Sequence, residues 1–149
     1  MILETKNKKI NLVLRTRKIA DVAKKLEGKN FEDVYFKAMS EFDLDALSKI
    51  IFTLAENEDK TNAFKNSSEV YDFIDDYMAE NNKTYKNIFE EIAEDINEEG
   101  FFNSKMSKKE LKDKISNPLS SMNMNDVIRN SAEKAITRVA EEQFQGYKA

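Results

Sequence analysis

Several residue types are missing or scarce in this chain, and each absence excludes a class of function. Among 149 residues there is no cysteine, which excludes a disulfide framework, a thiolate metal site and a cysteine nucleophile. Histidine is also absent, which removes the commonest general base and the usual transition-metal ligand. The serines have no histidine to activate them. We therefore expect no enzymatic activity, no metal and no cofactor.

Glycine and proline are scarce, with three glycines and one proline. Glycines at positions 28, 100 and 146 cannot form a glycine-rich phosphate loop, so nucleotide binding by such a motif is excluded. Few turn-forming residues favour helices over a sandwich or barrel. No apolar run approaches the ~18 residues of a membrane span, and the N-terminus lacks a signal-peptide core. The sequence therefore predicts a mainly α, intracellular protein that does not bind membranes.

The residues that are present indicate one soluble domain. The chain is long enough to bury a core without disulfides. Charged residues make up 35% of the chain, the net charge is −4, and both signs are interspersed along the expected helices. Such a surface keeps a protein soluble and does not indicate a polyanionic partner.

The N-terminal stretch "MILETKNKKINLVL" alternates apolar and polar residues on both sides of "KNKK". This pattern predicts a short β-hairpin, and a lone hairpin must pack on something because it is marginal in water. The following stretch predicts a helix with Thr16 as N-cap and Gly28 as its left-handed stop. Leu12 lies in the alternating pattern, so an unpaired hairpin edge is a candidate for accepting a partner's strand.

Four further amphipathic helices are predicted by apolar residues at helical spacing. We expect Asn30 to cap the first, with Phe42 on its buried face, and Asp43 to cap the second, "DLDALSKIIFTLAE", which is the most apolar and should be central. A polar loop, "ENEDKTNAFKN", is expected next, held by Phe64. The third helix should be capped by Asn66 or Ser67, and the fourth should end at Gly100.

The C-terminal part has a different character. A capping box from Ser107 to Glu110 predicts a short helix with Leu111 and Ile115 as anchors, broken at Pro118. The segment 126–144 is helical by propensity, with a thin apolar stripe that suits a partner. About six or seven helices are thus expected, in a core over residues 1–103 and a helical extension over residues 104–149.

Two charged clusters deserve a functional and a structural interpretation. Acidic residues on one helix face, with two on the preceding helix, suggest a carboxylate Mg²⁺ site, but a solvated face is the favoured interpretation. Those residues are Glu91, Glu94, Asp95, Glu98, Asp75 and Asp76. A basic patch suggests a small DNA-binding or regulatory protein, against which the acidic segments that follow argue. The patch consists of Arg15, Arg17, Lys18, Lys24 and Lys25.

The order of motifs resembles the tail assembly chaperones of siphophages and related prophages of Gram-positive hosts. Four stretches over roughly residues 9–103 carry the likeness. They are the hairpin running into "LRTRKIADVAKKLEGKN", the helix "DLDALSKIIFTLAE", the segment "EVYDFIDDYMAENNKTYKNIFEEIAE", and the closing "EEGFF".

The resemblance implies an assembly factor without a catalytic site. Its partners would be the phage tape measure protein, which it would keep soluble, and tail tube subunits, which it would recruit, with self-association as a further option. It would act in the host bacterial cytoplasm and be absent from the mature virion, without binding nucleic acid. The candidate partner-binding residues are Phe101, Phe102, Leu12, Val139 and Phe144.

Overall fold

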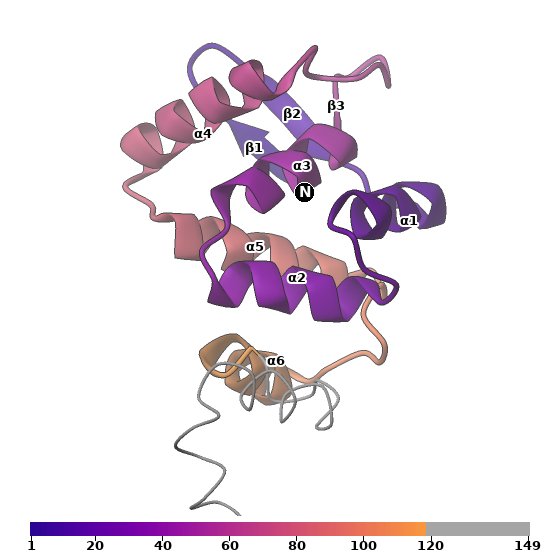
Figure 1. The fold of residues 1–149 in the computed structure, drawn as a ribbon. Coiled ribbons are helices and arrows are strands. Elements are labelled where there is room, and N and C mark those ends of the chain that lie inside the picture. The colour runs from indigo at the N-terminus through magenta and orange to yellow at the C-terminus, as the bar shows by residue number, and fades with distance from the viewer. Residues whose placement is uncertain (119–149) are drawn as a thin grey trace, which may run out of the picture. The chain divides into compact units, whose positions relative to one another are not determined.

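The alternating residues at the N-terminus form the predicted hairpin. The computed structural model describes residues 1–118, where strand β1 (Ile2–Glu4) pairs antiparallel with strand β2 (Lys9–Leu12) (Figure 1). Leu3 lies opposite Ile10 in the register, and both side chains are buried. The hairpin is therefore anchored by the apolar half of its alternating pattern.

A third strand, β3 (Ala55–Glu56), was not predicted. It pairs antiparallel with β2, giving the strand order β1-β2-β3. Leu12 lies opposite Ala55, so the second edge of β2 is paired within the domain. The polar loop after β3 turns back, and Phe64 is buried as expected.

Six helices follow the hairpin within residues 1–118, which confirms a mainly α domain with an N-terminal hairpin. They are α1 (Thr16–Lys25), α2 (Phe31–Ser40), α3 (Leu44–Leu54), α4 (Ser67–Asn81), α5 (Tyr85–Glu98) and α6 (Lys108–Ser116). Helix α6 belongs to the same compact unit as the hairpin, so this unit extends past the expected core boundary at residue 103. The expected helix 126–144 lies outside the described residues.

Most helix starts follow the capping residues read from the sequence. Asn30, Asp43, Asn66 and Ser107 each accept a hydrogen bond from the backbone N–H three residues later. Thr16 is the exception, because it is the first residue of α1 and the N-cap is Arg15, whose side chain makes no capping bond. The start of α1 is instead held by packing of its buried Ile19, Val22 and Ala23.

Gly28 does not provide the left-handed stop of α1. Glu27 takes that conformation, with φ 60°, and Gly28 follows it. A Cβ at position 28 would lie 2.0 Å from Cγ1 of Val34. The glycine is therefore needed for close approach of α2 rather than for its backbone freedom. Gly100, with φ 81°, does end α5 as expected.

Phe42 does not lie on the buried face of α2. It follows the helix with φ 51° and is 55% exposed. The backbone turns into the left-handed region here so that Asp43 can cap α3, and this turn directs position 42 away from the core. Phe36 and Met39 fill the buried face of α2 instead.

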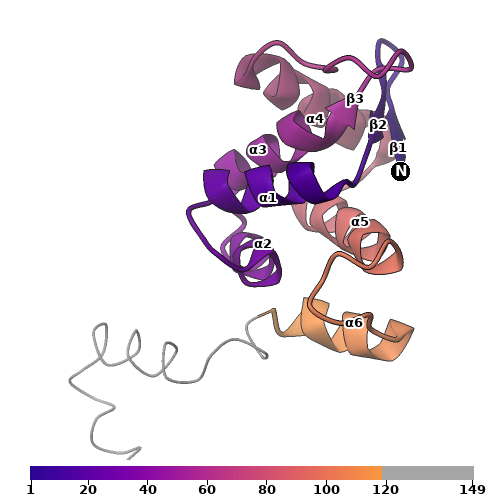
Figure 2. The same cartoon turned by 90° about the vertical axis from the view of Figure 1, so that its right-hand side faces the viewer.

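Helix α3 is central, as its apolar composition predicted. It contacts α1, α4 and β2, and Leu47, Ile50 and Leu54 are fully buried. Figure 2 shows α1 crossing α3, with the sheet at the edge of the helical layer. A second centre is aromatic, where Tyr35 of α2 meets Phe89 of α5 with ring centroids 5.9 Å apart.

Candidate functional site: a groove between α5 and α6

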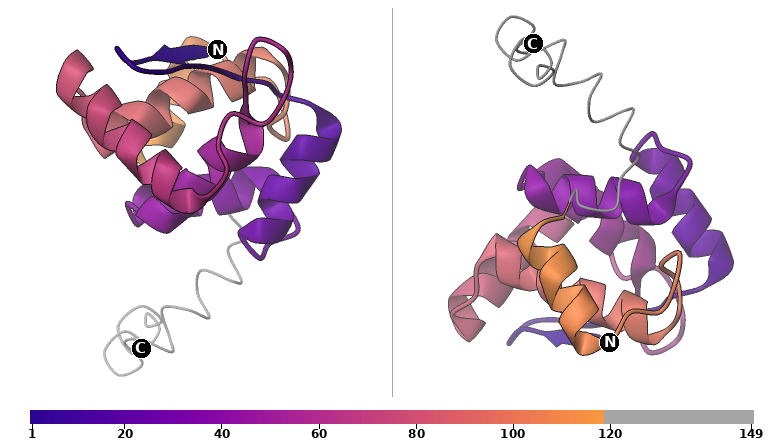
Figure 3. Two further views of the ribbon diagram at one scale, coloured as in Figure 1. Left: turned by 90° about the horizontal axis from the view of Figure 1, so that it is seen from above. Right: turned by 90° about the horizontal axis from the view of Figure 1, so that it is seen from below.

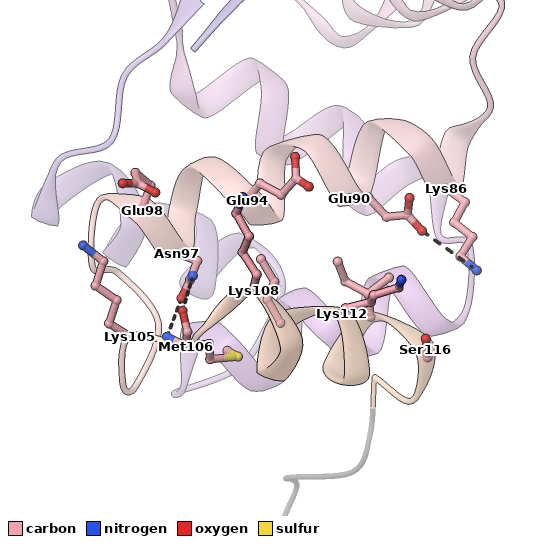
Figure 4. Close-up of a pocket in the computed structure, with 12 residues that line it drawn as sticks. Lys86, Glu90, Glu94, Asn97, Glu98, Lys105, Met106, Lys108, Lys112 and Ser116 are labelled. Carbon is pink, nitrogen blue, oxygen red and sulfur yellow. Dashed lines mark hydrogen bonds and ion pairs between the residues drawn. The ribbon is translucent and has the colours of Figure 1, made fainter.

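A groove of about 770 Å³ lies between α5 and α6. The two helices run antiparallel, with the start of α6 beside the end of α5 (Figure 4). Met106, Leu111 and Ile115 supply the apolar residues of the groove, and glutamates and lysines lie along its two sides.

The side chain of Asn97 holds the connection between the two helices. Its amide nitrogen donates to the carbonyl oxygen of Met106 at 2.9 Å, and its amide oxygen accepts from the N–H of Met106 at 2.8 Å (Figure 4). Asn97 is buried on α5, so this two-way bond is shielded from water. It fixes Met106 one residue before the cap of α6, which sets where α6 begins.

Helix α6 is held on the domain by few buried side chains. Leu111 and Lys114 are its buried residues, and the Lys114 ammonium lies 5.0 Å from the ring centroid of Phe36. Burial lowers the pKa of Lys114, while the nearby Glu32 and Asp33 carboxylates oppose this shift. Figure 3 shows α6 crossing the end of the domain formed by α2 and α5. One face of α6 therefore packs on the domain, and the adjoining face borders the groove.

The "GFF" motif lies between the end of α5 and the loop to α6. Phe102 is buried, with its ring centroid 5.0 Å from that of Phe36 and 6.1 Å from that of Phe31. Phe101 is half-buried against the core. The N–H of Phe101 donates to the carbonyl oxygen of Ile96 at 3.1 Å, and the N–H of Asn103 donates to Glu32 at 3.0 Å, so both sides of the motif are fixed.

The five candidate partner-binding residues are not brought together. Leu12 and Phe102 are buried in the domain's own core, so neither presents a surface to a partner in this conformation. Phe101 keeps a partly exposed ring near the start of the loop to α6. Val139 and Phe144 lie outside the described residues. Within residues 1–118, β2 is the central strand of the sheet and is paired on both sides, so the outer strands are β1 and β3.

Two residues of the basic patch form ion pairs within the domain. Arg15 and Lys18 both contact Glu56, at 2.5 and 2.7 Å, and the Glu56 side chain is 6% exposed. The hydrogen bond from Lys18, followed by that from Arg15, lowers the pKa of Glu56 against the effect of burial. Lys25 donates to the Thr53 hydroxyl at 2.9 Å. The patch therefore serves to hold α1 against β3 and α3.

The acidic residues are dispersed. Among residues 1–118, no group of three or more acidic side chains could hold a metal ion. Glu91 binds Lys83 and accepts from the Tyr77 hydroxyl. Asp95 lies 3.8 Å from the N-terminal amino group, and burial raises its pKa. Glu91 and Asp95 therefore make structural contacts, whereas Glu94 and Glu98 are exposed.

Comparisons with protein-family models, with curated proteins and with solved structures give no match for this chain. None of the helices in residues 1–118 has the length and apolar character that crossing a membrane requires.

Sequence reasoning placed α5 and α6 but did not find the groove. Leu111 and Ile115 were recognised as anchors of α6, whereas Asn97 and Met106 were not. The signal at Asn97 is a polar residue on the apolar stripe of α5, one position after Ile96. Such a residue needs a buried hydrogen-bond partner, but the sequence does not say which.

Proposed function

We propose that this protein is a phage tail assembly chaperone, which binds and solubilises the tape measure protein and recruits tail tube subunits. It would do so in the host bacterial cytoplasm and would be absent from the mature virion. The motif order from residue 9 to residue 103 supports the proposal. The structural observation that carries it is the groove between α5 and α6, because an assembly factor needs an open surface for a client.

The groove fits an amphipathic helix from a client. An incoming apolar stripe would cover Met106 and Ile115, which are half-buried in this domain. This form of recognition uses apolar anchors at helical spacing and needs no catalytic group, metal or cofactor. It also suits a tape measure protein, whose exposed apolar helix faces would otherwise aggregate.

Binding to DNA through the basic patch is the alternative, and the contacts of Glu56 count against it. Two of the five cations in the patch neutralise a buried carboxylate and are poorly placed to contact phosphates. If the patch bound DNA, affinity would fall steeply as salt rises. We expect no mobility shift of duplex DNA even at low salt.

Co-purification tests the proposal. Tagged full-length protein is co-expressed with the cognate tape measure protein and, separately, with tail tube protein, and the captured fraction is measured. The variant Ile115→Asp places a charge in the groove and should abolish capture. The control Tyr71→Asp changes an exposed aromatic residue on α4, outside the groove, and should leave capture unchanged. Failure to capture either partner would overturn the function, and equal capture by both variants would exclude the groove.

A further inference from the structure

The two sides of the groove carry opposite charge. Glu90, Glu94 and Glu98 line it from α5, and their spacing of four residues places them on one helix face. Lys108 and Lys112 line it from α6, and Lys105 from the loop before that helix. Figure 4 shows the three glutamates on α5 above and the lysines below, with the Lys108 side chain extending from α6 toward Glu94. Lys86 also lines the groove, at the start of α5. The groove therefore has a mainly acidic side, a basic side and an apolar floor, which consists of Met106, Leu111 and Ile115.

The charges on the two sides of the groove do not form ion pairs with each other. Within residues 1–118, no ion pair crosses the groove between the acidic and basic sides, and Glu90 is paired with Lys86 of its own helix at 3.9 Å. Glu94, Glu98, Lys108 and Lys112 are exposed. A ligand lying between the two sides would bring compensating charges to both.

We propose that the groove selects an amphipathic client helix whose charges are segregated, with Lys or Arg along one flank of the apolar stripe and Asp or Glu along the other. The basic flank lies against α5, and the acidic flank lies against α6. This inference rests on the proposed function for the identity of the client, and on the groove alone for the chemistry of the helix.

The charge pattern also fixes the direction of the bound helix. Reversing a helix while its apolar stripe stays on the floor exchanges the two flanks. Only one direction then places basic residues against Glu94 and acidic residues against Lys108. Electrostatic complementarity of this kind acts mainly on specificity and register.

Synthetic peptides test the rule without the natural client. Two helical peptides of about 18 residues, or five turns, share one apolar stripe and one composition. The first has Lys on one flank and Glu on the other, and the second has the same residues alternating on both flanks. Binding to the full-length protein is measured by fluorescence anisotropy. We expect the segregated peptide to bind about tenfold tighter, a difference that a few surface ion pairs supply.

A charge-reversed protein provides the second arm. Lys108→Glu with Lys112→Glu makes both sides acidic, so the preference for the segregated peptide should disappear. A third peptide with Lys on both flanks should now bind best. The control Lys109→Glu with Lys65→Glu makes the same change of net charge at exposed residues that do not line the groove. The control should keep the original preference, and circular dichroism verifies the fold of both variants.

The direction of the bound helix is read from paramagnetic broadening. The chain has no cysteine, so Ser116→Cys gives a single spin-label site at one end of the groove, and broadening should be confined to one end of the segregated peptide. Equal affinity for both peptides, broadening at both ends, or no saturable binding would each overturn the charge rule. Capture of the tape measure protein without peptide discrimination would reject the rule and keep the chaperone function. Discrimination between the two peptides without capture of the tape measure protein would keep the charge rule and reject the chaperone function.

Discussion

The hydroxyl of Tyr35 donates a hydrogen bond of 2.5 Å to the carbonyl oxygen of Phe89, entirely within the core. This bond joins α2 to α5, the helix that forms one side of the groove. Burial holds the pKa of the Tyr35 hydroxyl well above its usual value. The phenol is therefore a neutral donor throughout the physiological range.

Removing this hydroxyl should weaken the domain without unfolding it. Tyr35→Phe keeps the ring contacts and deletes one buried hydrogen bond, which costs about 1 kcal/mol of the free energy of unfolding. Urea denaturation at pH 7 measures the change. Above pH 10 the unfolded tyrosine loses its proton while the folded one keeps it, so wild-type stability falls with rising pH. The difference between wild type and variant should therefore shrink in alkali, and a constant difference would contradict the assignment.

Replacing Glu56, the buried carboxylate that binds Arg15 and Lys18, should lower the stability of the domain by an amount that depends on pH. Glu56→Gln removes both ion pairs and should lower the free energy of unfolding by about 1–3 kcal/mol at pH 7. The pKa of Glu56 is lowered in the folded state, so its stabilisation is present above the ordinary value of 4.5 and is lost as pH falls through the lower folded value. Urea titrations at neutral and acidic pH should show wild type and variant converging in acid. Divergence in acid would contradict the network.

Replacing Phe42, the exposed residue with positive φ after α2, should make the domain more stable. Phe42→Asn should raise the free energy of unfolding by about 0.5–1 kcal/mol, because asparagine tolerates a positive φ better than phenylalanine. Asn82 already occupies such a position at the end of α4, with φ 53°. The matched control Phe42→Ala removes the ring and keeps the strain, so it should give no gain. Thermal unfolding compares the three proteins, and a gain in the alanine variant would assign the cost to the exposed ring.

Because Gly28 lies close to Val34, substitutions at these two positions should have coupled effects on the stability of the domain. Gly28→Ala alone should destabilise the domain by about 1–3 kcal/mol, because the new methyl group overlaps a stiff branched side chain. Adding Val34→Ala should recover much of this loss, since the second change removes the overlapping atom. A double-mutant cycle by urea denaturation measures the coupling. Simple additivity of the two losses would show that Gly28 is required for another reason.

The elements that depend on neighbouring residues were predictable, and those that depend on distant ones were not. Asn30, Asp43 and Ser107 act as caps because the side chain of each accepts a hydrogen bond from the backbone N–H three residues later. Such a contact can be predicted from four consecutive residues. Strand β3 has two residues and forms because β2 is available to pair with it, so no local pattern marks it. The burial of Lys114 likewise depends on the ring of Phe36 from α2. The sequence of α6 alone does not indicate this contact.

The groove illustrates the same limit. Glu94 and Glu98 were expected to lie on a solvated helix face, and no prediction was made for the lysines of the groove. That this face and the lysines of α6 border one opening follows from the Asn97 bond to Met106, which sets the position of α6. The sequence contains both helices but not the relation between them.

The central position of β2 has a consequence for synthesis of the protein. Its first partner, β1, lies only a few residues before it in the chain, but its second partner, β3, follows about forty residues later. A hairpin of this length is marginal by itself, so the N-terminal strands emerge early and wait for α3 and β3 before they are covered. The sheet can therefore be completed only after β3 has been synthesised, because until then Leu12 has no pairing partner on that side.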